Sequence, residues 1–217
     1  MTESTLRLFV VRHGDTAYSE KQQFAGSRDI PLSPTGAAQC RAVAERLAQV
    51  KVSAIYSSQA ERARTSAEII AAPHGLLVTV DNTFREMTLG RWEGFTREEV
   101  AARFPDDYRT WRSAPHTLSF HGAETLDDVR SRVSAGLARV ADMHKGRVVV
   151  LVTHAIVVRL LVLDALGLGL ERLWSIDASP AGITDIEYEA GATTVHAMNT
   201  VAHLPPNCIQ PTGVRST

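Results

Sequence analysis

The chain has 217 residues, of which 44% are hydrophobic, so a single domain can bury a sizeable core without a metal ion or disulfide to stabilise it. Its formal net charge of −1 excludes a general positive field that attracts nucleic acid or an anionic membrane, so we expect neither partner. Of its 23 lysine and arginine residues, only Lys21, Lys51 and Lys145 are lysine. A codon-biased genome explains this arginine excess, as does a need for forked guanidinium groups that bind phosphate or carboxylate.

Short apolar runs alternate with segments of helical periodicity along the chain. Strands are predicted at residues 6–12, 54–57, 76–80 and 148–152, with a late pair at 183–188 and 194–197 that can occupy an edge. Helices are predicted at residues 35–50, 60–72, 125–143 and 155–166. This alternation favours an α/β sandwich with a mostly parallel sheet.

The remaining segments suggest one domain with two appendages. Residues 84–124 contain shorter elements, two prolines and the aromatic residues Trp92, Tyr108 and Trp111 among others, so we expect a small lid or insertion there, within a single domain over residues 1–202. Residues 203–217 contain three prolines and are predicted to form a flexible tail. Because the start of the chain lacks a signal-peptide pattern and the two cysteines, Cys40 and Cys208, do not form a disulfide framework, we expect a cytoplasmic protein.

Two histidines follow apolar strands directly. His13 comes after the run that ends at Arg12, and His154 comes after the run that ends at Thr153. In open α/β sheets, ligands bind at the carboxyl ends of the strands, so both imidazoles are candidate site residues, although a single histidine there is more often structural. Gly14 follows His13, and we expect it to let a substrate approach the backbone closely.

Two further blocks carry charged groups beside turn residues. Arg62 lies in the first turn of the predicted helix at 60–72, where the helix N-terminus already favours an anion. Glu86 precedes a Gly90-Arg91-Trp92-Glu93-Gly94 segment, in which we expect Trp92 to brace the loop.

Taken in order, these motifs resemble the histidine phosphatase superfamily, the phosphoglycerate mutase-like group. The resemblance covers about residues 5–200 and rests on the Arg12-His13-Gly14 motif, residues 29–33 with Gly36, residues 57–67, residues 86–94 and His154. It implies a three-layer α/β/α sandwich. It also implies a small phosphorylated metabolite as the partner, and no cofactor.

The resemblance implies a role for each matched residue. His13 is the nucleophile that forms a phosphohistidine intermediate. Arg12, Arg62 and His154 surround the transferred phosphoryl group and offset its charge in the transition state. Glu86 is the general acid that protonates the leaving oxygen, and then the base that activates water. A homodimer is the default assembly for such folds.

Other positions depart from the family pattern or extend it. Asp15 stands where Glu is common, Ala155 where Gly is usual, and Ser19 where the family usually has Asn, which puts one phosphate contact in doubt. We expect Ser19 and Ala155 to contact the phosphate or substrate. Three further binding candidates are Phe24 and Gly26, in a loop that the family places beside the substrate, and His121, for which a surface position is the alternative.

The sequence favours hydrolysis over phosphoryl transfer back to substrate. Met87 follows Glu86 where the mutases have Arg, so we expect a phosphatase, with a cofactor-dependent phosphoglycerate mutase or a non-catalytic phospho-ligand-binding relative as the alternatives. None of the eight histidines shows the spacing of a zinc site, so we expect a metal-independent enzyme. No motif identifies the leaving group.

Overall fold

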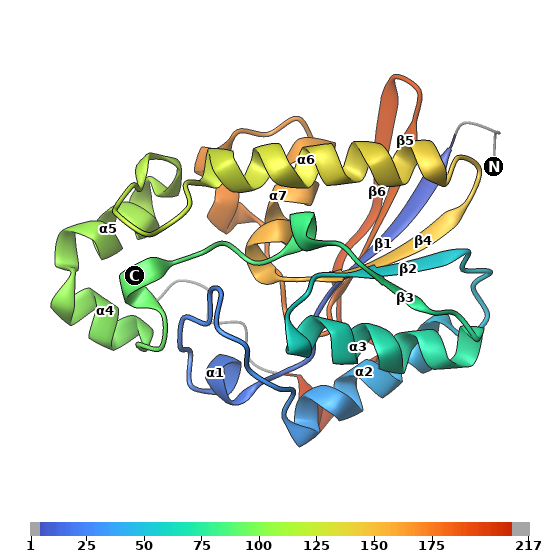
Figure 1. The fold of residues 1–217 in the computed structure, drawn as a ribbon, viewed down its shortest axis with the longest axis horizontal. Helices are drawn as coiled ribbons and strands as arrows, with labels where there is room; N and C mark the ends of the chain where they lie inside the picture. The colour runs from blue at the N-terminus through green and yellow to red at the C-terminus, as the bar shows by residue number, and fades with distance from the viewer. Residues whose placement is uncertain (1–4, 210–217) are drawn as a thin grey trace.

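A computed structural model describes residues 5–209 of the chain. These residues contain one six-stranded sheet in the order β3-β2-β4-β1-β5-β6 (Figure 1). The strands are β1 (Leu6–Arg12), β2 (Ala54–Ser57), β3 (Val78–Val80), β4 (Val148–Thr153), β5 (Ile183–Glu189) and β6 (Ala192–Thr200). The first four are parallel, whereas β5 is antiparallel to β1 and β6 is antiparallel to β5. The mostly parallel sheet with a late edge strand is therefore confirmed.

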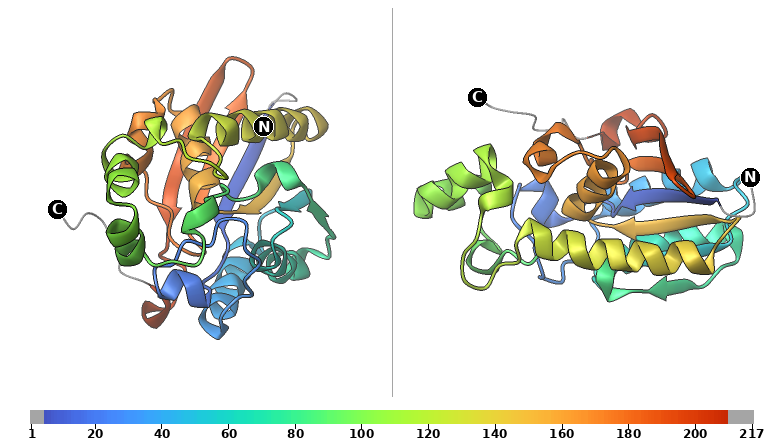
Figure 2. Two further views of the ribbon diagram at one scale, coloured as in Figure 1. Left: turned by 60° about the vertical axis from the view of Figure 1, so that its left-hand side comes forward. Right: turned by 90° about the horizontal axis from the view of Figure 1, so that it is seen from above.

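Helices cover both faces of this sheet. The α-helices of the described residues are α1 (Ala17–Glu20), α2 (Pro34–Leu47), α3 (Glu61–Ala71), α4 (Arg97–Arg103), α5 (Pro105–Ser113), α6 (Leu126–Met143) and α7 (Ala155–Ala165). Short 3-10 helices are η1 (Ala72–His74), η2 (Asn82–Phe84), η3 (Gly90–Trp92), η4 (Pro115–Thr117), η5 (Leu170–Ser175) and η6 (Pro206–Cys208). Figures 1 and 2 show α2 and α3 on one face of the sheet and α6 and α7 on the other.

The alternation of side chains along the strands builds two separate cores. In β1, Leu8 and Val10 pack into the core that includes α6 and α7, while Phe9 and Val11 pack into the core that includes α2 and α3. Successive residues of a strand point to opposite faces, so one apolar run supplies both layers. The three-layer α/β/α sandwich is confirmed.

Residues 84–124 form their own small group of elements beside the sheet. Its helices α4 and α5 lie at the end of the molecule where α1 lies (Figure 1). Trp92 is fully buried at the centre of this group, with ring centroids 5.1 Å from Phe120, 5.3 Å from Phe24 and 6.0 Å from Trp111. Trp92 therefore holds the segment together, as predicted.

Some boundaries differ from those predicted. Strand β3 begins at Val78 rather than at residue 76. The prediction took the apolar Leu77 as part of a buried strand, but Leu77 is 93% exposed. The start of the predicted tail is packed rather than flexible: Leu204 and Cys208 are buried, and Gln39 Nε2 donates to the Cys208 carbonyl at 2.8 Å. The rest of that tail, residues 210–217, lies outside the described residues.

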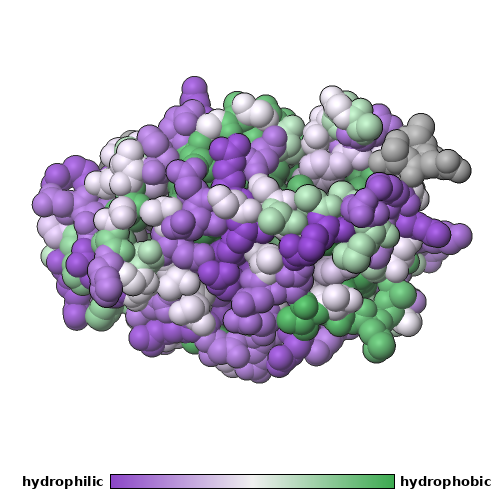
Figure 3. Space-filling view, turned by 45° about the horizontal axis from the view of Figure 1, so that its top comes forward, coloured by the Kyte–Doolittle hydropathy of each residue, from purple (hydrophilic) through white to green (hydrophobic). Residues whose placement is uncertain are grey.

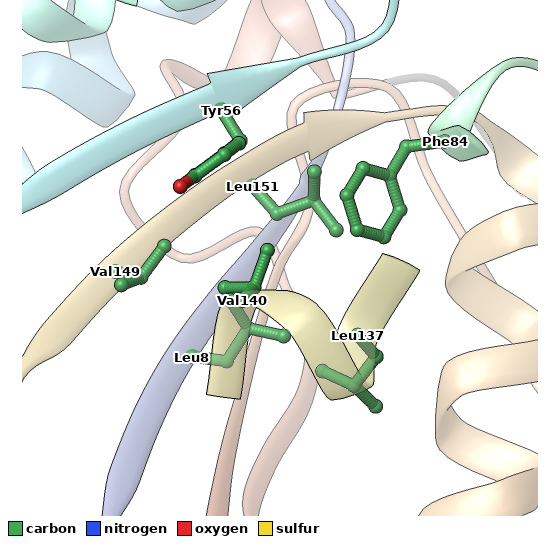
Figure 4. A pocket seen from close by; sticks show the side chains of 7 residues that line it. All are labelled: Leu8, Tyr56, Phe84, Leu137, Val140, Val149 and Leu151. Carbon is green, nitrogen blue, oxygen red and sulfur yellow. The ribbon is translucent and has the colours of Figure 1, made fainter. Parts of the chain in front are cut away.

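The surface and the interior contain few other features that bear on function. The face viewed in Figure 3 is mostly hydrophilic, with smaller hydrophobic areas between the polar ones. Figure 4 shows an apolar crevice between α6 and the sheet that is too narrow to admit a water molecule, lined by Leu8, Tyr56, Phe84, Leu137, Val140, Val149 and Leu151. No helix in the described part of the chain is long and apolar enough to cross a membrane.

Candidate active site

The two strand-end histidines lie side by side. Strands β1 and β4 are parallel neighbours in which Arg12 pairs with Thr153, so the next residue of each strand leaves the sheet at the same place. His13 and His154 therefore have ring centroids 5.2 Å apart, and both are buried. The structure brings together the two imidazoles that the sequence placed at equivalent strand ends.

His13 presents an unprotonated nitrogen. Its Nδ1 lies 2.7 Å from the Gly14 carbonyl oxygen, which only accepts, so Nδ1 carries the hydrogen and Nε2 keeps a lone pair. Burial, and after it the positive charges of Arg62 and Arg12, hold the pKa of His13 well below its usual range. A neutral imidazole with an unprotonated Nε2 is a nucleophile.

Arg62 is held rigidly against this nitrogen. The side chain is 1% exposed and begins in the first turn of α3. Its Nε donates to His13 Nε2 at 3.3 Å, while its Nη atoms donate to the carbonyls of Arg28 at 2.7 Å and Gly26 at 3.0 Å. These bonds fix the guanidinium before any ligand binds, so little reorganisation is needed at the moment of reaction.

Arg12 and His154 have polar groups that no neighbour satisfies. Arg12 Nη1 donates to the Ala178 carbonyl at 2.7 Å, but the buried Nε of Arg12 has no partner among residues 5–209. His154 Nε2 lies 2.6 Å from Ser58 Oγ, and its buried Nδ1 is likewise unpartnered within that range. Buried polar atoms are rarely left unpaired, so these atoms suit a polar ligand.

Glu86 lies in the loop between η2 and η3 and lines the same cavity as His13 and Arg62. Its Oε1 accepts from the Met87 amide at 2.9 Å, and its Oε2 accepts from the Ile156 amide, in the first turn of α7, at 3.5 Å. Arg132 on α6 donates to the Glu86 carbonyl at 3.2 Å and also to Glu124. Glu86 is thus held by two helices far from it in sequence, its backbone by α6 and its carboxylate by α7.

These groups open onto a cavity of about 470 Å³, a size that suits a small organic ligand. Of the residues predicted to form the site, the cavity is lined by Arg12, His13, Ser19, Phe24, Gly26, Arg62, Glu86 and Ala155. His154 is not among the residues that line the cavity, although its ring contacts that of His13, which does. The structure does not bring His121 to this cavity, because its side chain is exposed in a surface turn.

Ser19 lines the cavity, but its hydroxyl is already used. Its single hydrogen faces the Asp15 carboxylate at 2.9 Å and the Thr16 carbonyl at 3.0 Å, and its oxygen accepts from the Thr16 amide at 2.7 Å. Asp15 is fully buried and also accepts from Gln39 Nε2 at 2.7 Å. The two departures from the family pattern therefore pair with each other, and Ser19 is no free donor to a phosphate.

Gly14 has a different role from the one predicted. It does not line the cavity, and a Cβ atom added to it would lie 2.4 Å from the Gly36 carbonyl oxygen. The glycine is needed because α2 packs against the backbone of this loop, not because substrate approaches there.

Sequence reasoning missed several residues of the cavity wall. Three further arginines line it: Arg97, Arg112 and Arg159. Two tryptophans also line it, Trp111 and Trp174, and their ring centroids are 4.9 Å apart. Arg97 and Arg112 lie in the segment predicted as a lid, where no motif marked them as site residues. Arg159 interrupts the apolar run of the helix predicted at 155–166, and this interruption was the one visible signal. Within residues 5–209, no three His, Cys, Asp or Glu side chains cluster as potential metal ligands.

Comparisons with known proteins agree with this geometry. A family model described as histidine phosphatase superfamily (branch 1) matches residues 8–201. Phosphoserine phosphatase 1 of Hydrogenobacter thermophilus is 31% identical over 199 residues, which cover 92% of this chain and 94% of that protein. The structure of YhfR from Bacillus stearothermophilus has a TM-score of 0.87 at 30% identity, covering 91% of this chain and 98% of that one. Mycobacterial glucosyl-3-phosphoglycerate phosphatase has a TM-score of 0.82 at 28% identity, covering 90% and 99%. The chain therefore belongs to the histidine phosphatase superfamily, branch 1.

Proposed function

We propose that the protein is a phosphomonoesterase that hydrolyses a small phosphorylated metabolite through a phosphohistidine intermediate on His13. The observation that carries the proposal is the unprotonated Nε2 of His13, held beside Arg62 at the wall of the cavity. A phosphoryl group that binds there meets the nucleophile and the guanidiniums of Arg12 and Arg62 together. Two similar proteins, the phosphoserine phosphatase of Hydrogenobacter thermophilus and the mycobacterial glucosyl-3-phosphoglycerate phosphatase, support the same reaction class.

The reaction takes two displacements at phosphorus. In the first, His13 Nε2 forms a bond to phosphorus and the bond to the ester oxygen breaks, while Glu86 gives its proton to the leaving alkoxide. In the second, Glu86 takes a proton from water, the water oxygen bonds to phosphorus, and the phosphorus–nitrogen bond breaks to release phosphate. Arg12, Arg62 and His154 stabilise the charge on the equatorial oxygens in both steps.

The proposal extends to the surroundings of this chemistry. Charge stabilisation by fixed guanidiniums takes the place of a metal ion, so we propose a metal-independent enzyme. Residues 84–124 act as a lid over the cavity within a single domain of residues 1–202, since Arg97, Tyr108 and Trp111 from that segment line it. We further propose a cytoplasmic homodimer, as expected from the two free cysteines and from folds of this class.

Phosphate release from a substrate panel tests the proposal. The panel contains 3-phosphoglycerate, phosphoserine, α-ribazole phosphate and an aryl phosphate, with interconversion of 2- and 3-phosphoglycerate as the mutase arm. We expect release that persists in EDTA and disappears in His13→Ala, while the control His196→Ala, at an exposed histidine on β6, stays active. Glu86→Gln should slow an alkyl ester far more than an aryl ester, because only the alkoxide needs a proton. Loss of activity in EDTA, or interconversion faster than release, would contradict the proposal.

A further inference from the structure

The cavity contains more positive charge than one phosphoryl group requires. Beside Arg12 and Arg62, three further guanidiniums line it, from α4, α5 and α7, whereas its lining carboxylates are Glu86 and Asp177. Uncompensated like charges repel one another unless an anion binds between them. The excess of arginines therefore indicates that the ligand carries more negative charge than a single phosphoryl group.

Arg159 on α7 is the most firmly placed of the additional arginines. Its side chain is 15% exposed, its guanidinium lies over the ring of Trp174 at 5.1 Å, and its Nε donates to the Ile176 carbonyl at 2.9 Å. Asp177 reaches it only at 4.0 Å, since that carboxylate already accepts from the Ala178 amide at 2.8 Å and from Asn199 Nδ2 at 3.1 Å. The Nη groups of Arg159 thus keep unused hydrogen-bonding capacity.

Arg97, the first residue of α4, adds a second charge with no acidic partner in the described range. Its Nη1 donates to the neutral amide oxygen of Gln22 at 3.3 Å. It lines the same cavity as Arg12 and Arg159, and its charge lowers the pKa of both, after the larger effect of burial. Burial and these neighbours bring the pKa of Arg159 to about 10, which leaves it cationic at neutral pH.

Arg12 and Arg159 are anchored to one short segment of backbone. Arg12 donates to the carbonyl of Ala178, and Arg159 donates to the carbonyl of Ile176, two residues earlier. Both side chains line the same cavity, as does Arg97. An anion bound at Arg159 therefore lies in the same cavity as a phosphoryl group at Arg12 and His13.

We propose that Arg159 and Arg97 form a second anion subsite, and that the substrate is a phosphate monoester carrying another anionic group, a carboxylate or a second phosphate. The inference rests on the proposed phosphatase function and specifies its substrate class. Charge-assisted hydrogen bonds to a planar guanidinium supply the selectivity, and esters that lack the second anion leave the subsite unneutralised.

Matched pairs of esters test the subsite. O-phosphoserine is compared with O-phosphoethanolamine, which lacks only the carboxylate, and fructose 1,6-bisphosphate is compared with fructose 6-phosphate for the second phosphate. In at least one pair we expect kcat/KM to be about 10-fold or more higher for the ester that carries the second anionic group. The pair that shows this preference identifies that group as a carboxylate or a phosphate. Arg159→Gln and Arg97→Gln should each remove most of that preference by raising KM for the ester with the second anion, with a much smaller effect on the other member of the pair. Arg109→Gln, on an exposed side chain of α5 that pairs with Asp106, is the matched control.

Two outcomes would overturn the subsite: no preference in the wild type, or a Gln variant that slows both members of a pair equally. Arg97→Gln decides the question if Arg159→Gln does not fold, because Arg97 is only partly buried. Failure of the phosphatase proposal would be recognised separately, as no hydrolysis of any ester. In that case calorimetric binding of each pair to the His13→Ala protein still measures the preference, and equal affinities would reject the subsite.

Discussion

At the scale of single residues, the group that organises the Glu86 loop is Arg132. Its guanidinium donates to the carbonyls of Thr83 at 2.9 Å, Arg85 at 2.7 Å and Glu86 at 3.2 Å, and it makes two further bonds to the Glu124 carboxylate. Three backbone carbonyls within four residues of the chain thus accept from one side chain of α6. Arg132 does not itself line the cavity but bonds to the backbone of Glu86, which does, so we infer that it acts by positioning Glu86.

Replacing Arg132 should therefore lower turnover more than binding. In Arg132→Leu we expect kcat to fall by about 10-fold or more, because small displacements of a catalytic group are costly, while KM changes little. Arg139→Leu is the matched control on the same helix, since Arg139 is half exposed and pairs with Asp81 away from Glu86. Steady-state kinetics on an aryl phosphate, with thermal unfolding of both variants, separates the two. A rise in KM with unchanged kcat would contradict a positioning role.

At the scale of elements, the start of α2 and the loop after β1 meet backbone to backbone. A Cβ atom on Gly36 would lie 2.1 Å from the Asp15 carbonyl oxygen, and one on Gly14 would lie 2.4 Å from the Gly36 carbonyl oxygen. Ser33 caps α2 and accepts from the Gly36 amide at 3.1 Å, which fixes the first turn in this position. The helix therefore holds the loop that carries His13.

This contact reverses the usual effect of an alanine in a helix. Gly→Ala normally stabilises a helix by up to about 1 kcal/mol, but in Gly36→Ala the clash is with backbone, and we expect a net loss of roughly 1–3 kcal/mol in the free energy of unfolding. Activity should fall as well, since the His13 loop must move. The control Ala38→Gly, two residues along the same helix, should lose stability by propensity alone and keep its activity. Urea unfolding and phosphate-release assays measure both; a stabilised or fully active Gly36→Ala would refute the packing argument.

At the scale of the whole molecule, the sequence predicted the features that neighbouring residues determine, and it missed those that depend on the packing of distant segments. Buried strands such as β1 are visible because Leu8 to Val11 are apolar on both faces, whereas the exposed edge strand β6 is polar in sequence and was predicted too short, at 194–197 instead of 192–200. The motif residues proposed for the site follow strands and helix starts, so local sequence signals were enough to predict them. Arg132 and Arg159 were not, because only the packing of distant helices turns an ordinary helical arginine toward the Glu86 loop or the cavity.

The whole molecule also carries the energetic cost of keeping its site histidines neutral. Burial is the first cause that holds the pKa values of His13 and His154 well below the usual range, and the charges of Arg62 and Arg12 add to it. In the unfolded chain each imidazole returns to a pKa of about 6.5. Between these two values the unfolded chain binds protons that the folded chain does not, so the free energy of unfolding decreases as the pH falls below about 6.5.

We accordingly expect acid to destabilise the protein well before its carboxylates titrate. Between pH 7.5 and 5.5 the free energy of unfolding should fall with a limiting slope of about 1.4 kcal/mol per pH unit for each of the two histidines, and urea unfolding across this range measures it. His13→Asn combined with His154→Asn should flatten the slope, leaving the smaller contribution of the partly buried histidines whose pKa values are also lowered, His74, His144 and His203. His196→Asn, at an exposed position, should leave it unchanged. A double variant as acid-sensitive as the parent would mean that the site histidines are already protonated in the folded protein, which is incompatible with a free lone pair on His13 Nε2.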